Sequence, residues 1–127
     1  MSGEKKQVQL FDPIYLDEML ELSGPMGSVH VRKIIDAYLR GIDQYLEKIH
    51  AARAANRAEE LRKAVHGLGG SSGTVGANAV HRICYELEDA LDEGAGVEAW
   101  DQRESTIDRY VPATKEALVK YREKLAE

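Results

Sequence analysis

The chain has 127 residues, a net charge of −5, 43% hydrophobic residues and 31% charged residues. This length suits one domain with a single core, and the composition is that of a globular rather than a disordered protein. The acidic balance argues against general nucleic-acid binding, which needs a basic surface. No apolar run approaches the roughly 20 residues that span a membrane, so we expect no membrane association.

The N-terminus and the cysteine content favour a cytoplasmic location. Residues 1–6 are polar and are not followed by the apolar segment of a signal peptide. Cys84 is the one cysteine and cannot form an internal disulfide, which fits a reducing compartment. We expect residues 1–10 to form a disordered leader and residues 11–127 to form a single domain.

Two helices are predicted in the first half of the chain. Asp12 and Pro13 indicate a helix start, and this short helix should end near Leu22, before the Ser23–Gly27 breaker. A long helix should follow from Ser28 to about residue 55. Its apolar residues recur every three or four positions: Ile34, Ile35, Tyr38, Leu39, Ile42, Tyr45, Leu46 and Ile49.

Three further helices are predicted in the second half. Asn56 with Glu59 resembles a capping box that starts a helix running to about residue 73. The next helix covers about 78–92, and the last runs from about 97 to 124, with a kink or split at Pro112. The pattern shows no strand-like alternation. We therefore expect an all-α fold in which the last four helices form an antiparallel four-helix bundle, with the short N-terminal helix added to it.

A histidine followed by a glycine cluster marks residues 64–77. On an ideal helix one face is mostly apolar and carries Leu61, Val65, Leu68, Ser72 and Val75. His66 lies off that face, together with Arg62, Gly69, Gly70 and Gly73. Each interior glycine costs roughly 1 kcal/mol relative to alanine, so the cluster needs a reason. Close approach of a partner is one reason, and a loop is the simpler alternative.

His66 has the chemistry of a nucleophile. A neutral imidazole offers a lone pair and can carry a covalent intermediate. On the same helix face, however, no Asp or Glu lies close enough to orient it, since Glu59 is two turns away. A self-contained hydrolase site is therefore poorly supported.

Other motifs are weaker. The segment Gly67–Gly76 lacks the Gly-Lys-Ser/Thr ending of a phosphate-binding loop. Glu47 and His50 match one half of a di-iron motif without a second half, which leaves a metal-binding bundle as a minor alternative. We interpret Cys84 as a buried, inert thiol and His81 as a structural or solvated residue. The remaining residues of interest are expected in packing roles: Tyr38, Tyr45 and Trp100. For the two tyrosines, docking of a partner protein is the alternative.

The glycine-rich stretch resembles the histidine phosphotransfer (Hpt) domain family of two-component phosphorelays. The family signature reads roughly His-x-Leu-Lys-Gly-Ser-Ser, followed by a hydrophobic residue, Gly and Ala. Residues 66–72 match all but one fixed position, and residues 75–77 supply the continuation. Cys84, Leu87 and Glu88 also fit the family pattern.

The resemblance implies a phosphocarrier rather than a stand-alone catalyst, which leaves open whether the protein counts as an enzyme. His66 would exchange a phosphoryl group with aspartates of response-regulator receiver domains, including those of hybrid histidine kinases. A docking surface around Gly69, Gly70, Gly73 and Arg62 would meet the receiver. The chain itself would need no cofactor or metal, because the receiver would hold the divalent metal ion.

One position departs from the family pattern. The family usually has lysine three residues after the histidine, where this chain has Gly69. A phosphoryl group adds a charge of about −1.5 to −2, so the missing cation should weaken the phosphorylated state. Arg62 and Lys63 are possible substitutes, although helical side chains lean towards the N-terminus and thus away from His66. A cation on the preceding helix, such as Arg53, and a cation supplied by the partner are the alternatives. The alternative function is an Hpt-like module that binds a receiver or kinase without carrying phosphate.

Overall fold

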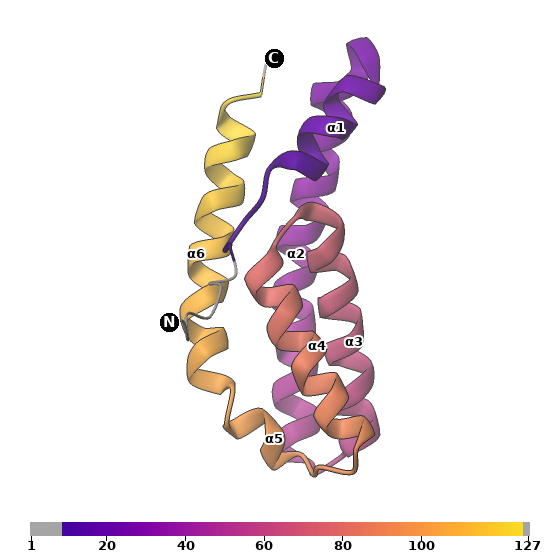
Figure 1. The fold of residues 1–127 in the computed structure, drawn as a ribbon, viewed down its shortest axis with the longest axis vertical. Coiled ribbons are helices and arrows are strands. Elements are labelled where there is room, and N and C mark those ends of the chain that lie inside the picture. The colour runs from indigo at the N-terminus through magenta and orange to yellow at the C-terminus, as the bar shows by residue number, and fades with distance from the viewer. Residues whose placement is uncertain (1–8, 126–127) are drawn as a thin grey trace, which may run out of the picture.

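The computed structural model describes residues 9–125, and within them it contains helices and no strand (Figure 1). The elements are α1 (Ile14–Leu22), the 3-10 helix η1 (Gly24–Met26), α2 (Gly27–Ala54), α3 (Ala58–Val75), α4 (Asn78–Asp92), α5 (Glu98–Asp101) and α6 (Glu104–Glu123). The predicted all-α bundle is confirmed. Residues 1–8 of the expected leader lie outside the described residues.

Three helices form the centre of the bundle. α3 packs extensively against both α2 and α4, while α6 runs alongside them and α5 closes one end (Figure 1). The apolar spacing of α2 explains its position, because it places one stripe of side chains in the core. Members of that stripe are Val31, Ile35, Tyr38, Ile42 and Ile49.

A tight turn reverses the chain between α3 and α4. Gly76 has a φ of 81°, the left-handed conformation that ends many helices, and the Ala77 N–H donates back to the Ser72 carbonyl at 2.8 Å. The Gly76 carbonyl accepts the Asp12 N–H at 2.9 Å. The segment before α1 is thus tied to the turn next to the glycine cluster.

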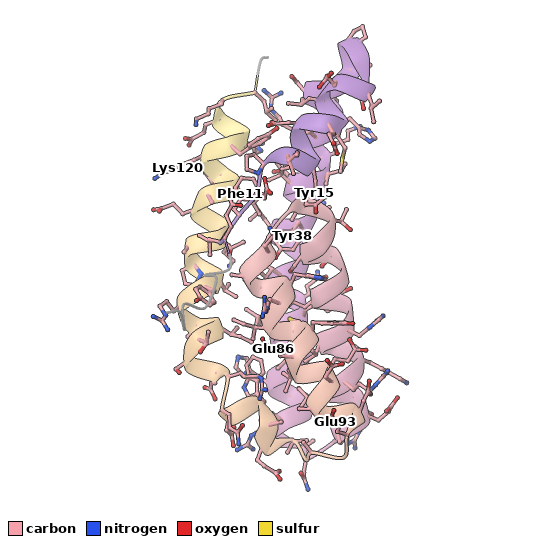
Figure 2. All side chains as sticks on the ribbon, viewed as in Figure 1. Phe11, Tyr15, Tyr38, Glu86, Glu93 and Lys120 are labelled. Carbon is pink, nitrogen blue, oxygen red and sulfur yellow. The ribbon has the colours of Figure 1, made fainter. Side chains whose placement is uncertain are left out.

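Phe11 anchors the same segment to α6. Its ring, labelled in Figure 2, lies between α1 and α6. It packs edge-on against Tyr121, with 5.9 Å between ring centroids. The Tyr121 hydroxyl donates a hydrogen bond to Asp17 of α1 at 2.6 Å. These contacts join the two ends of the described chain.

Two local predictions are wrong: the helix cap at Asn56 and the split of the last helix at Pro112, whereas a kink at Pro112 stays a prediction. Asn56 does not cap α3: it takes a positive φ of 57°, and Arg57 precedes the helix without a side-chain cap. The last predicted helix is divided at residues 102–103 into α5 and α6, whereas Pro112 lies inside α6. Between them, the Arg103 N–H bonds to the Trp100 carbonyl at 2.8 Å, so a turn around buried Trp100 makes the break.

Candidate functional site

His66 lies in the middle of α3 and points out of the bundle. Its side chain is 71% exposed, whereas the opposite face of the helix is fully packed. The buried residues of that face are Leu61, Val65, Leu68, Ser72 and Val75. Two more turns of helix follow His66, to Val75. Core packing therefore holds the glycine-rich half of α3 in helical form despite its low propensity.

A carboxylate from the neighbouring helix holds the His66 ring. Nδ1 of His66 lies 3.1 and 3.0 Å from Oε1 and Oε2 of Glu88 in α4. A carboxylate only accepts hydrogen bonds, so this contact places the proton on Nδ1. In the neutral ring Nε2 then carries the lone pair.

Glu88 could not be identified as this partner from spacing along the chain, because helical spacing relates His66 only to residues of its own helix. The signal was present in α4, where a carboxylate borders the buried stripe that contains Cys84 and Leu87. Using that signal requires knowing which face of α4 meets α3. Spacing along one helix does not supply this.

Arg62 extends the contact into a charged network. Its guanidinium lies 2.6 Å from Asp92 and 3.4 Å from Glu88, both on α4. The hydrogen bond to Asp92 and the negative charges around it raise the pKa of Arg62. Arg62 is therefore engaged with α4 behind Glu88, and its predicted docking role stays a prediction.

The glycines near His66 serve different purposes. A Cβ on Gly69 would lie 3.0 Å from Cβ of Cys84, and one on Gly73 would lie 3.1 Å from Nδ1 of His81. Both glycines thus let α4 approach α3 closely, a packing role that the sequence analysis did not foresee. A Cβ on Gly70 would meet nothing within 4 Å. Gly70 leaves open surface beside His66, and docking at these glycines remains a prediction.

A second imidazole lies close to the first. His81 of α4 has its Nδ1 2.7 Å from the Gly69 carbonyl oxygen, and its ring stacks on Tyr85 with 6.2 Å between centroids. Both histidines line a small hollow of about 160 Å³. The full lining is His66, Gly69, Gly70, His81, Tyr85 and Glu88.

The packing roles expected from the sequence are confirmed for three residues. Cys84 is buried, which raises its thiol pKa to about 12 and makes it a poor nucleophile. Tyr38 is buried and its hydroxyl lies 2.7 Å from Oγ of Ser72. Trp100 is also buried.

Two features of residues 9–125 bear on the alternatives. No group of three or more His, Cys, Asp or Glu side chains in this range is placed to hold a metal ion. The minor alternative of a metal-binding bundle therefore gains no support. No helix in the same range is long and apolar enough to cross a membrane.

Comparisons with known proteins identify one matching family and two solved structures with a similar fold. A sequence model described as the Hpt domain matches residues 33–120. Histidine-containing phosphotransfer protein B (HptB) from Pseudomonas aeruginosa has a TM-score of 0.74 at 21% identity, covering 92% of this chain and 97% of that one. The HPT domain of a sensor hybrid histidine kinase from Shewanella has a TM-score of 0.70 at 21% identity, covering 88% and 95%. No curated protein sequence matches significantly. At this identity the two solved structures show a common fold.

Proposed function

The chain belongs to the Hpt domain family, and from this premise we propose that it relays a phosphoryl group between receiver-domain aspartates through His66. One observation supports this most directly. His66 is exposed in mid-helix while Glu88 engages its Nδ1, so Nε2 is the nitrogen left for reaction. Gly70 beside it leaves room for a second domain.

The transfer step follows from the assigned proton. The Nε2 lone pair of His66 attacks phosphorus of a receiver aspartyl phosphate. The N–P bond forms as the P–O bond breaks, and the aspartate leaves as a carboxylate. The proton on Nδ1 stays in place, so the ring becomes a phosphorylated imidazolium whose positive charge faces Glu88. The reverse sequence returns the group to another receiver.

Such chemistry depends mainly on positioning and on neutralising charge. α3 and α4 supply the positioning, since His66 and Glu88 project from two packed helices. In this proposal the receiver supplies the divalent metal ion. The chain is then a phosphocarrier and acts with its partner rather than alone.

The docking surface should be small and transient. Gly70 and Thr74 continue along α3 from His66 and are exposed, one turn apart. A receiver placed over them would bring its aspartyl phosphate to Nε2. Transient interfaces of this kind typically bury less than about 1,200 Å².

Transfer can be tested with a purified receiver that has been phosphorylated with radiolabelled acetyl phosphate. We expect label to move to this chain within minutes, in an acid-labile and alkali-stable form. His66→Gln should abolish it. His30→Gln is the matched control, because His30 is an exposed histidine outside the site.

The same experiment separates transfer from the alternative of binding without phosphate. A pure binding module would associate with the receiver, yet label would never appear on this chain. Equal loss of label from the receiver with and without the chain would overturn the proposed function for that receiver. Repeating the assay across receivers from the same genome would extend that result to the whole set.

A further inference from the structure

The hollow beside His66 has an uneven charge lining. Glu88 contributes a carboxylate, and none of the described residues that line the hollow is lysine or arginine. Arg62 lies behind Glu88 at 3.4 Å and neutralises part of its charge. A phosphoryl group on His66 would bring about −1.5 to −2 charges to this place. Its only cationic neighbour in the lining would be a protonated imidazole.

His81 is built into this lining. The Gly69 carbonyl can only accept, so its 2.7 Å contact with Nδ1 of His81 places a proton on Nδ1. Protonation of the ring must then take place at Nε2. Gly73 leaves the space that the ring occupies, since a Cβ there would lie 3.1 Å from Nδ1. The Tyr85 ring lies nearly parallel to the His81 ring, with 6.2 Å between the ring centroids.

We propose that the phosphoryl group of phosphorylated His66 occupies this hollow, and that protonated His81 donates Nε2–H to one of its oxygens. The proposal rests on the proposed function and names the phosphoryl-binding residue of that same site. His81 thus supplies a cation to a lining in which, apart from the His66 ring that carries the phosphoryl group, the charged side chain is the Glu88 carboxylate.

The proposal predicts how the site responds to pH. Three titratable groups face His81, namely His66 from α3 and Tyr85 and Glu88 from its own helix. Arg82, next to it in α4, is paired with Glu86. Phosphorylation adds a dianion to this set, and an opposite charge at close range favours the charged form of a histidine. Phosphorylated chain should therefore bind a proton at His81 more tightly than unmodified chain does.

The test uses phosphoramidate, which phosphorylates histidine directly, and NMR of the whole chain. After modification the proton-titration midpoint of the His81 ring should move up by about one pH unit. The midpoints of His30 and His50 should stay where they are. An unchanged His81 midpoint beside a phosphorylated His66 overturns this proposal alone. Failure of His66 to accept phosphate overturns the proposed function and this inference with it.

Two variants separate binding from packing. In His81→Asn the amide nitrogen takes the place of Nδ1 and retains the bond to the Gly69 carbonyl, while Nε2 is lost. At pH 6, in equilibrium with a phosphorylated receiver, its phosphorylated fraction should fall up to tenfold relative to the wild type. The loss should be smaller at pH 8.5 than at pH 6, because a histidine ring loses its positive charge as the pH rises. His30→Gln should match the wild type at both values, and a pH-independent deficit in His81→Asn would mean that His81 only packs.

Discussion

The contact between His66 and Glu88 makes the reactivity of one nitrogen depend on a single carboxylate. Glu88→Ala removes the acceptor that keeps the proton on Nδ1 and the charge that faces the phosphorylated imidazolium. We predict a fall of about tenfold in the rate of transfer from a phosphorylated receiver, equivalent to about 1.4 kcal/mol. The transfer rate of Glu88→Gln should lie between those of the wild type and Glu88→Ala, because the amide oxygen of Gln still accepts the hydrogen bond from Nδ1.

The matched control for Glu88 is Asp92→Asn. Asp92 binds Arg62 in the same network but does not contact His66. Its transfer rate should stay close to that of the wild type in single-turnover measurements. An Ala variant at position 88 that transfers at the wild-type rate would show that Glu88 does not set the tautomer.

The buried thiol of Cys84 should make the folded protein less stable at alkaline pH. Burial raises the pKa of its thiol from an ordinary 9.0 to about 12. Between pH 9 and pH 12 the unfolded chain releases the thiol proton, whereas the folded chain keeps it. The free energy of unfolding therefore keeps its full value below pH 9 and falls above it. The contribution lost by pH 10 is about 1 kcal/mol.

Urea unfolding at pH 7.5 and at pH 10 measures this effect. Cys84→Ala should lose less stability between the two values than the wild type does. The change between the two pH values is the quantity to compare, because the substitution also removes packing at both. Burial raises the pKa of Tyr38 as well, so a residual decline above pH 10 should persist in the variant.

At the scale of an element, the glycines of α3 provide a matched pair. Gly70→Ala adds a methyl group in open space and should raise the free energy of unfolding by about 1 kcal/mol, the difference in helix propensity. Gly69→Ala gains the same propensity but pushes Cβ to 3.0 Å from Cys84. Its stability should be about 1–2 kcal/mol below that of Gly70→Ala, the cost of overpacking the contact between α3 and α4. Chemical denaturation measures both, and equal values would contradict a tight interface.

Helix existence could be predicted from the sequence, and helix junctions only in part. The apolar repeats located α2 and α4 to within a residue, because a buried stripe leaves a clear period of 3.6. The break before α6 was misplaced at Pro112. Proline is the usual local cause of a break, whereas the actual turn at residues 102–103 follows buried Trp100 and depends on tertiary packing. Asn56 likewise adopts a left-handed turn that its cap-like spacing does not reveal.

Only the part of the candidate site that lies on one helix, α3, could be predicted from the sequence. The position of His66 outside the packed stripe followed from periodicity and is confirmed. The contributions of Glu88 and His81 could not be derived, because both come from α4 and depend on how that helix faces α3. The same limit applies to Gly69 and Gly73, whose packing role depends on the facing helix. Sequence periodicity shows which side chains share a face of one helix, but it does not show which faces of two helices pack together.

Over the whole molecule, packing is unevenly distributed, and the site lies in the better-packed part. α3 makes extensive contacts with two helices, whereas α6 makes fewer with each neighbour. Apart from its buried residues, α6 is held by partly exposed pairs such as Arg122 with Asp36 at 2.9 Å, which contribute little. Pro112 also lacks the N–H of a regular helical bond.

We therefore predict that α6 opens before the α2–α3–α4 core does. In native-state hydrogen exchange its amides should exchange with a lower opening free energy than those of Leu61 to Leu68 in α3. Leu118→Ala, which removes a fully buried side chain from α6, should lower that opening energy by about 2–4 kcal/mol. At 25 °C the same variant should still accept phosphate at His66, because α3 and α4 hold both His66 and Glu88. Simultaneous loss of protection in α3 and α6 would instead mean that the bundle unfolds as one unit and that the site has no stability of its own.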